Sequence, residues 1–572
     1  MNIFLTCLNA KFIHSNLAIR YLSSYISYYS DYRPKIKIRE FTINDQIEYI
    51  LSSIYLEKPQ IIGLSCYIWN IEETLMLTRS LKKVLPDSKI ILGGPEVSYD
   101  GEAVMKENPQ IDYIVYGEGE VTFLKLVEAL DKEKDLSKIS GLIYRKNRDI
   151  VQNGPRELIK DLDTIPFPYD EELSGLENKV IYYETSRGCP FNCKYCLSST
   201  IKGVRFFSLD RVFKEIDLFI DKGVNQVKLV DRTFNCNLER AKDIIRHILS
   251  RGGKTNFHFE IAAHIIDDEI IDLLNSAPLD LFQLEIGIQS TNEATLHAVD
   301  RKTNLETIAN VVKRVREPRN VHIHLDLIAG LPYEGYESFR KSFDDVYKMG
   351  ADNLQLGFLK LLKGSGLRLE EEKHGYIYTD YSPYEVLKND YIDYGEIVKL
   401  KDIEDLLGKY SNSNRFVHSI RFLLPYFGKS AFLLLEDFAA FWREKGLFDV
   451  SHSLTTLFEI IFEYVKNIDR IPIDVFKEVL RLDYCLWQKP SRYPKCIEPK
   501  EMGNRFLSEF LDSEENINKY LPEYKGYTKR QLTRAVHTEV FKHDPISGEI
   551  KRTIVLFDYK AKSLDGTQFF KL

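Results

Sequence analysis

The sequence lacks any apolar run that approaches the ~20 residues of a membrane-spanning helix. Its first five residues carry no basic leader or small-residue cleavage site and have the pattern of a strand instead. Long basic runs are missing too, and the formal net charge of −7 gives no reason to expect a partner with a phosphate backbone. These absences predict a cytoplasmic protein with no membrane segment, and they leave no clear nucleic-acid signal.

Cysteine is scarce, since eight cysteines in 572 residues are too few for a disulfide framework. Three of them nevertheless fall close together, at Cys189, Cys193 and Cys196, which indicates a metal site in a reducing compartment. No repeat or low-complexity segment stands out. The length exceeds what one hydrophobic core usually serves, and 44% hydrophobic with 28% charged residues is typical of folded protein. Several domains are therefore expected.

Residues 1–140 alternate short apolar strands with helical patterns, which predicts an α/β domain built on an open, doubly wound parallel sheet of the Rossmann or flavodoxin-like type. The five strands are expected at residues 2–8, 35–41, 60–65, 89–93 and 112–116. Such sheets bind ligands at the carboxyl ends of their strands. The candidate ligand contacts at those ends are Ser65, Gly93, Gly94, Gly117, Glu118 and Gly119. Glycine lets backbone approach a bulky ligand closely, although glycine turns after strands are common without one.

Residues 141–178 have the pattern of a hairpin followed by a linker. Between residues 179 and 368 strands and helices alternate again, and six strands are expected at residues 180–184, 226–230, 256–261, 281–288, 321–327 and 353–359. Three of these strands have one polar face; in the fifth it carries His322, His324 and Asp326. The histidines could act as bases or simply bond their neighbours. Polar inner faces favour a partial (β/α)6 barrel of the TIM type around a polar ligand, and an antiparallel sheet with one wet face is the alternative.

Residues 369–572 are rich in helical patterns and end in a predicted β-hairpin at residues 536–559. We therefore expect a mainly helical C-terminal domain, whose function the sequence does not reveal. The domain could cap the barrel, bind a carrier protein or recognise a polymer, and no residue in it chooses between these roles.

The three clustered cysteines have the spacing Cys-x-x-x-Cys-x-x-Cys and follow the first barrel strand, at the end where barrel enzymes build their sites. Three thiolates can ligate three irons of a cubane cluster and leave the fourth iron open, whereas an electron-transfer cluster normally takes four cysteines. Zinc is the alternative, but a closed zinc site needs a fourth ligand and usually a second paired arm. The other cysteines stand singly, at Cys7, Cys66, Cys236, Cys485 and Cys496.

With Tyr195 before its last cysteine, this segment resembles the signature of the radical SAM superfamily, and the resemblance covers residues 179–365. Together with residues 1–140, the chain is similar to the subgroup that carries an N-terminal cobalamin-binding domain. The resemblance implies a 4Fe-4S cluster on the three cysteines, with an open iron that chelates S-adenosylmethionine. One-electron reduction would then split the carbon–sulfur bond and give a 5'-deoxyadenosyl radical.

The same resemblance implies a set of contacts with S-adenosylmethionine. They are Tyr195 near the adenine, Asp231 at the methionyl amino group, Glu260 and Gln289 at the ribose, and Leu331 and Pro332 in a turn beside the adenine. The glycines that usually accompany the acidic residue are missing around Asp231. Each polar residue of the set could instead belong to a satisfied hydrogen-bond network inside the barrel.

The N-terminal domain lacks the Asp-x-His-x-x-Gly motif whose histidine ligates cobalt in many cobalamin domains, and His14 does not have that spacing. We therefore expect bound cobalamin to have no histidine ligand from the protein, as in much of this subgroup. A sheet domain that no longer binds cobalamin is the alternative, because fold does not guarantee function.

The predicted reaction is hydrogen abstraction from an unactivated carbon followed by methyl transfer. The enzyme is expected to be oxygen-sensitive, to work anaerobically and to take electrons from a reductant such as flavodoxin or ferredoxin. A radical cyclisation or rearrangement without methyl transfer is one alternative, and a cobalamin-binding regulatory protein with a structural cluster is another. The sequence identifies neither the substrate nor the oligomeric state.

Overall fold

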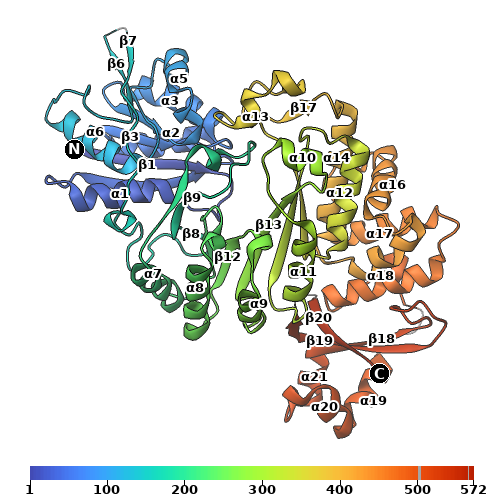
Figure 1. Cartoon of the computed structure of the whole chain (residues 1–572). Coiled ribbons are helices and arrows are strands. Elements are labelled where there is room, and N and C mark those ends of the chain that lie inside the picture. The colour runs from blue at the N-terminus through green and yellow to red at the C-terminus, as the bar shows by residue number, and fades with distance from the viewer. Residues whose placement is uncertain (148, 500–503, 564–565) are drawn as a thin grey trace.

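The computed structural model describes residues 1–147, 149–499, 504–563 and 566–572. Three regions follow one another along the chain: an N-terminal sheet domain, a central barrel, and a C-terminal region of helices that ends in a small sheet (Figure 1). No helix in the described ranges is long and apolar enough to cross a lipid bilayer.

The N-terminal domain is built on a seven-stranded sheet with the order β2-β1-β3-β4-β5-β6-β7. Its first five strands run parallel in the flavodoxin-like order, which confirms the predicted open sheet. The central strands are almost fully buried, because helices cover both faces. The strands are β1 (Asn2–Asn9), β2 (Lys35–Thr42), β3 (Ile61–Ser65), β4 (Lys89–Gly93) and β5 (Tyr113–Val115). The helices are α1 (Leu17–Tyr29), α2 (Ile47–Glu57), α3 (Ile71–Val84), α4 (Pro95–Ser98), α5 (Gly101–Glu107) and α6 (Gly119–Asp131).

A hairpin of β6 (Leu142–Lys146) and β7 (Asp149–Gln152) extends the N-terminal sheet antiparallel to β5. The sheet thus continues past residue 140, where the sequence analysis begins a separate hairpin and linker. The physical reason is that β5 would otherwise be an exposed edge, and the first three side chains of β6 are buried against it.

The central domain is an incomplete barrel of six parallel strands in the order β8-β11-β12-β13-β14-β15. β8 and β15 are its two edges, so the barrel stays open on one side. The parallel arrangement confirms the predicted partial barrel, and the antiparallel alternative is wrong. The strands are β8 (Ile181–Tyr183), β11 (Gln226–Leu229), β12 (Asn256–Glu260), β13 (Phe282–Gln289), β14 (His322–Ala329) and β15 (Asn353–Phe358). The helices are α7 (Leu209–Asp221), α8 (Leu238–Arg251), α9 (Asp268–Asn275), α10 (Glu293–Ala298), α11 (Leu305–Arg316) and α12 (Tyr336–Lys348).

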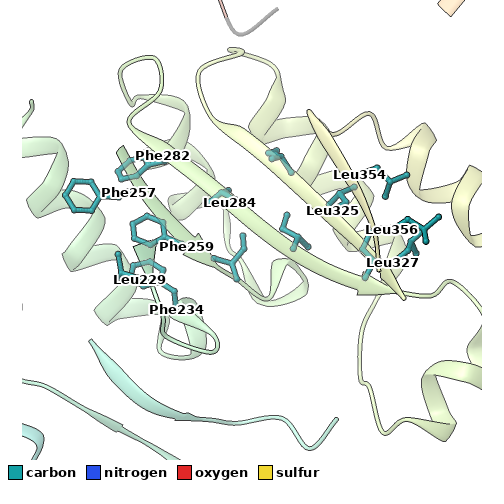
Figure 2. Close-up of a cluster of buried hydrophobic side chains, with 14 of the residues drawn as sticks. Leu229, Phe234, Phe257, Phe259, Phe282, Leu284, Leu325, Leu327, Leu354 and Leu356 are labelled. Carbon is teal, nitrogen blue, oxygen red and sulfur yellow. The ribbon is translucent and has the colours of Figure 1, made fainter. Parts of the chain in front are cut away.

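The two faces of the barrel strands differ in chemistry. Apolar side chains such as Phe257, Phe259, Leu284 and Leu325 form one continuous buried cluster (Figure 2). In β14 from His322 to Leu327 the exposure alternates residue by residue, with the apolar positions buried and the polar ones half-buried. The polar side chains of the strands therefore point to the inside of the barrel, where they can contact a ligand.

The C-terminal region packs helices against the barrel and ends in a three-stranded antiparallel sheet. The predicted hairpin is confirmed as β18 (Val536–Phe541) and β19 (Thr553–Ser563). A third strand, β20 (Gly566–Lys571), extends the hairpin, and the sequence gives it little signal because only two of its residues are large and apolar. The short strands β16 (Ile377–Tyr378) and β17 (Val386–Lys388) precede the helices. The helices are α13 (Gly366–Leu369), α14 (Tyr394–Leu406), α15 (Val417–Leu423), α16 (Ala431–Glu444), α17 (Leu454–Lys466), α18 (Ile473–Trp487), α19 (Asn504–Leu511), α20 (Glu514–Tyr520) and α21 (Lys529–Ala535).

Candidate functional site

A short hairpin at the carboxyl end of the first barrel strand carries the three clustered cysteines, with Cys189 at the end of its first strand and Cys193 and Cys196 in its connecting loop. It pairs β9 (Ser186–Cys189) with β10 (Gly203–Phe206), and the sequence analysis does not anticipate it. Gly188 has a φ of +104°, and a Cβ at this position would lie 2.1 Å from the carbonyl oxygen of Gly203. Only glycine therefore allows the close strand approach that presents Cys189 at the rim of the barrel.

The three thiols line a cavity of about 180 Å³ in the mouth of the barrel. Each sulfur has a polar group of the protein within hydrogen-bond distance, which would help to orient it as a metal ligand. The pairs are Arg301 Nη1 with Cys193 at 3.6 Å, the Ser198 N–H with Cys196 at 3.4 Å, and the Thr233 hydroxyl with Cys189 at 3.6 Å.

The spacing of these thiols does not suit a single metal ion. Across the described residues, one group of three His, Cys, Asp or Glu side chains has all its ligand atoms within 4.8 Å of one another, and it lies in the C-terminal region. A mononuclear site gathers its ligands around one centre, whereas a cubane spreads its thiolates over separate irons. As far as the structure describes the cavity, no fourth cysteine lines it. The arrangement fits a three-thiolate cubane with one open iron.

Arg301 is a site residue that the sequence analysis missed. Its guanidinium donates to the Tyr195 hydroxyl at 3.0 Å and to the carbonyl oxygen of Gly287. Burial raises the pKa of Tyr195, so its hydroxyl stays neutral beside the cysteines. Arg301 follows α10 in a loop that no local pattern marks, and only the fold brings it to a cysteine loop 108 residues earlier than itself.

Three of the six predicted S-adenosylmethionine contacts line the cavity: Tyr195, Glu260 and Gln289. Gln289 has a φ of +74°, and its Oε1 is buried without a hydrogen-bond partner, which leaves an acceptor for a ligand. Leu331 and Pro332 do not line the cavity. Leu331 is buried in the apolar cluster that packs against Tyr195, so its position supports the aromatic ring from behind.

Asp231 is a correction to the sequence analysis, because it does not line the cavity. Its carboxylate accepts backbone N–H bonds from Thr185 and Ser186, both at 2.7 Å, and the Thr185 hydroxyl bond at 2.6 Å. Burial raises its pKa to about 6. A carboxylate whose oxygens are used in this way fixes the turn between β8 and β9 and is not free to bind the amino group of a ligand.

A further acidic side chain, Glu285, lines the cavity and is paired with two basic side chains. Glu285 lies 3.0 Å from Nε2 of His258 and 2.9 Å from Nζ of Lys228, and these neighbours lower its pKa to about 2. Asp326 also lines the cavity, and its Oδ1 is buried without a hydrogen-bond partner. Burial, together with the nearby carboxylate of Glu285, raises the pKa of Asp326 to about 7. Asp326 can therefore hold or release a proton near neutral pH.

The two histidines of β14 do not line this cavity. Nε2 of His322 lies 2.9 Å from the carboxylate of Asp280. Nε2 of His324 lies 3.4 Å from the side-chain amide of Gln283, and burial lowers the pKa of His324 to about 4. Both histidines bond neighbours within the barrel, so neither is placed as a base for a ligand at the cysteines.

A second, larger cavity of about 720 Å³ lies between the carboxyl edge of the N-terminal sheet and the barrel. Apolar side chains of the sheet, including Leu64, Ile91 and Phe123, form part of its wall. Gly94 has a φ of +108°, and a Cβ there would meet the carbonyl oxygen of Cys66 at 2.4 Å. All the residues predicted at the strand ends line this cavity: Ser65, Gly93, Gly94, Gly117, Glu118 and Gly119.

Glu118 connects the wall of the second cavity to the cysteine hairpin. Its carboxylate lies 2.7 Å from Nη2 of Arg205 and 3.3 Å from Nη1 of Arg187, and it accepts the backbone N–H of Ile159 at 2.8 Å. Arg187 and Arg205 face each other in the β9–β10 pair. Glu118 is therefore engaged by protein and links the two domains.

The two cavities meet at Arg232, which lines both of them. Its side chain is exposed and makes no hydrogen bond or ion pair with any residue that the structure describes. A guanidinium in this position can bind an anionic or carbonyl group of a molecule that reaches from one cavity to the other.

Three family models match successive segments of the chain, and these segments correspond to the three regions of the fold. A B12 binding domain model matches residues 5–127, the radical SAM superfamily model matches residues 183–346, and a model for a protein of unknown function, DUF4080, matches residues 372–557. The central segment of the chain thus matches the radical SAM superfamily. It is preceded by a segment that matches B12 binding domains and followed by one that matches DUF4080.

Two methyltransferases are among the proteins that this chain resembles in sequence. The chain is 29% identical over 307 residues to the uncharacterized methyltransferase PH0819 of Pyrococcus horikoshii, covering 52% of this chain and 66% of that protein. It is 26% identical over 339 residues to the cobalamin-dependent radical SAM methyltransferase TokK of Streptomyces tokunonensis, covering 56% and 49%. The match thus spans about half to two thirds of these relatives.

Among solved structures, the cobalamin-dependent S-adenosylmethionine radical enzyme OxsB, with aqua-cobalamin and S-adenosylmethionine bound, has a TM-score of 0.58 to this chain. It is 17% identical, and the alignment covers 89% of this chain and 75% of OxsB. At this identity the likeness concerns the fold, which extends across the sheet domain, the barrel and much of the C-terminal region.

Proposed function

We propose that this chain is a cobalamin-dependent radical SAM enzyme that methylates an unactivated carbon. The observation that carries the proposal is the junction at Arg232, where a cavity lined by three metal-competent cysteines adjoins a cavity at the carboxyl edge of a B12-binding sheet. PH0819 and TokK, both methyltransferases by name, are consistent with this reaction.

The residues present fit the three cofactors that the family implies. Cys189, Cys193 and Cys196 would hold a 4Fe-4S cluster, and Glu260 with Gln289 would bind S-adenosylmethionine beside it. The larger cavity, with its glycine edge and apolar wall, would hold cobalamin. When bound, the cluster and S-adenosylmethionine supply a 5'-deoxyadenosyl radical, and cobalamin supplies a methyl group.

The protein's own part is to position these groups and to present the substrate between them. Arg187 and Glu118 join the cysteine hairpin to the sheet domain, which would fix the distance between the two cavities. Arg232 would hold a polar group of the substrate at their junction. Asp326, with one free carboxyl oxygen facing the first cavity, would hold a proton and donate it in a hydrogen bond to the substrate near neutral pH.

The cellular setting follows from the chemistry. An exposed, open iron site is sensitive to oxygen, so we propose that the protein works anaerobically in the cytoplasm. We also propose that a small redox protein, flavodoxin or ferredoxin, delivers the electron. The identity of the substrate stays open.

The experiment that tests the proposed function needs no substrate. Anaerobically reconstituted protein is incubated with S-adenosylmethionine, hydroxocobalamin and a strong reductant. We expect both 5'-deoxyadenosine and S-adenosylhomocysteine, and neither product above background from a Cys196→Ala variant. 5'-Deoxyadenosine alone would favour a radical cyclisation or rearrangement. Absence of both products from cluster-loaded protein would favour a cobalamin-binding regulatory protein.

A further inference from the structure

A separate cluster of metal-ligating side chains lies between helix α18 and the terminal sheet. Cys485 on α18 and His537 and Glu539 on β18 each offer one ligand atom, and these three atoms lie within 4.8 Å of one another. Nε2 of His537 is 2.8 Å from Oε1 of Glu539. The exposed fractions of the three residues are 0%, 8% and 1%, so the cluster is closed to solvent.

The pattern of β18 explains how the cluster forms. His537 and Glu539 are two positions apart on a strand, so their side chains point to the same face. Phe541, the next residue on that face, packs with Leu482 and Cys485 of α18. The other face of the sheet packs against α19 and α21. The three ligands therefore meet in a buried interface between α18 and the terminal sheet, which lie next to each other in Figure 1.

The donor set is chemically specific. A thiolate, an imidazole and a carboxylate are the ligand types that zinc uses, whereas calcium and magnesium prefer oxygen ligands alone. The Cys485 thiol is fully buried, and it would release its proton to solvent when a divalent ion binds.

The surroundings of Glu539 provide the second observation. Oε2 of Glu539 and Nε of Arg481 are 3.3 Å apart, yet each is buried without a hydrogen bond. Oε1 accepts the hydroxyl of Tyr493, which also lies 3.3 Å from Nε2 of His537. A buried carboxylate with an unsatisfied oxygen is expensive unless something binds it. Tyr493 and Arg481 have the positions of groups that orient ligands around a metal.

We propose that Cys485, His537 and Glu539 bind one structural Zn²⁺ ion that fastens the terminal sheet to helix α18. A buried water molecule would complete a four-coordinate site. The site shares no residue with the two cavities, so the proposal of a metal site can be tested independently of the proposed function. Cys485 and His537 are far apart in the sequence, and the segment between them carries α19 and α21. The bound ion would therefore hold the two ends of that segment together.

The test uses the full chain with Cys189, Cys193 and Cys196 all replaced by alanine, which removes iron and its colour. This protein, produced with added zinc, should contain one zinc per chain by elemental analysis. Cys485→Ser, His537→Gln and Glu539→Gln in that background should each lower the zinc content at least tenfold. Cys496→Ser, which changes the other cysteine of the C-terminal region, is the matched control and should keep its zinc.

Cobalt(II) gives a second readout. Cobalt in place of zinc should produce a thiolate-to-cobalt absorption band that Cys485→Ser abolishes and Cys496→Ser retains. If a variant does not fold, chelation of the parent protein replaces it: removing zinc should lower the Tm, and adding zinc back should restore it. A zinc-supplemented chain without zinc, or zinc that persists in all three ligand variants, would overturn the proposal and leave a hydrogen-bond network in its place.

Discussion

Nη2 of Arg187 lies 2.6 Å from Oε1 of Glu120, so a side chain two residues before the first clustered cysteine is paired with the first turn of α6 in the N-terminal domain. The same guanidinium lies 3.3 Å from Glu118 and 2.8 Å from Glu184, and all these side chains are largely buried. One arginine therefore ties together the cysteine hairpin, the end of β8 and the edge of the N-terminal sheet. This network therefore fixes the position of one cavity relative to the other.

Arg187→Gln should destabilise the protein strongly, because it leaves three buried carboxylates without their shared cation. Breaking a buried ion pair by removing one partner costs about 3–5 kcal/mol. The exposed pair of Lys222 with Glu172 is the matched control, and Lys222→Gln should cost about 0–1 kcal/mol. Urea unfolding under anaerobic conditions measures both. Equal losses of unfolding free energy in the two variants would show that the buried Arg187 network stabilises the protein no more than an exposed ion pair.

Asp326→Asn should stabilise the protein at alkaline pH. The folded-state pKa of Asp326 is raised to about 7, from an ordinary value of 3.8, so the folded chain binds the proton more tightly than the unfolded chain. Its contribution to stability is fully present below pH ~4 and is lost as pH rises through 7. At pH 8 the variant should be about 2–4 kcal/mol more stable than the parent, and the difference should shrink at pH 5.

Unfolding curves at the two pH values provide the measurement for Asp326. Asp380→Asn, at an exposed position, serves as the control and should show no such pH dependence. A stability difference for Asp326→Asn that does not change between pH 5 and pH 8 would contradict the raised pKa.

Gly188→Ala should abolish cluster assembly. The left-handed φ and the contact of a Cβ with Gly203 force the β9–β10 pair apart and displace Cys189. Backbone strain of this kind costs about 1–3 kcal/mol, and the clash adds to it. Iron and sulfide analysis after reconstitution should give a large loss. Gly154→Ala, where a Cβ meets nothing within 4 Å, should retain full iron content.

Arg232→Gln should reduce product formation without lowering stability, because its side chain makes no contact that folding needs. A lost charge-assisted hydrogen bond is worth about 1.5–3 kcal/mol, or roughly ten- to a hundredfold in rate. We expect a loss of that size in S-adenosylhomocysteine formation. Lys302→Gln is the comparison, since Lys302 lines the first cavity alone. Equal losses of S-adenosylhomocysteine formation in both variants would argue against a distinct role for Arg232 at the junction of the two cavities.

The strands and their polar faces could be predicted because they depend on short-range periodicity. From His322 to Leu327, for example, β14 alternates polar and apolar residues, and that pattern survives in the fold. The glycines after β4 and β5 could be predicted as cavity residues because parallel strands bring their carboxyl ends to one edge. The cysteine spacing likewise carries its chemistry within one loop.

What escaped prediction depends on contacts between distant segments. Arg301 reaches the cysteines only because α10 returns to the mouth of the barrel, and no neighbour of Arg301 in the sequence signals this. The family resemblance implies a ligand contact for Asp231, but its carboxylate instead accepts three hydrogen bonds from Thr185 and Ser186. His537 and Glu539 look like ordinary strand residues until α18 brings Cys485 against them.

The larger cavity has walls from two domains, and this has a thermodynamic consequence. A molecule that fills it touches both walls, so part of its binding free energy is spent on holding the domains together. Occupancy and interdomain cohesion should then rise and fall together, with a melting temperature that climbs with ligand concentration. The protein would be most stable when the cavity is occupied. Without a ligand, the two domains would separate first at the interface where Glu118 pairs with Arg205.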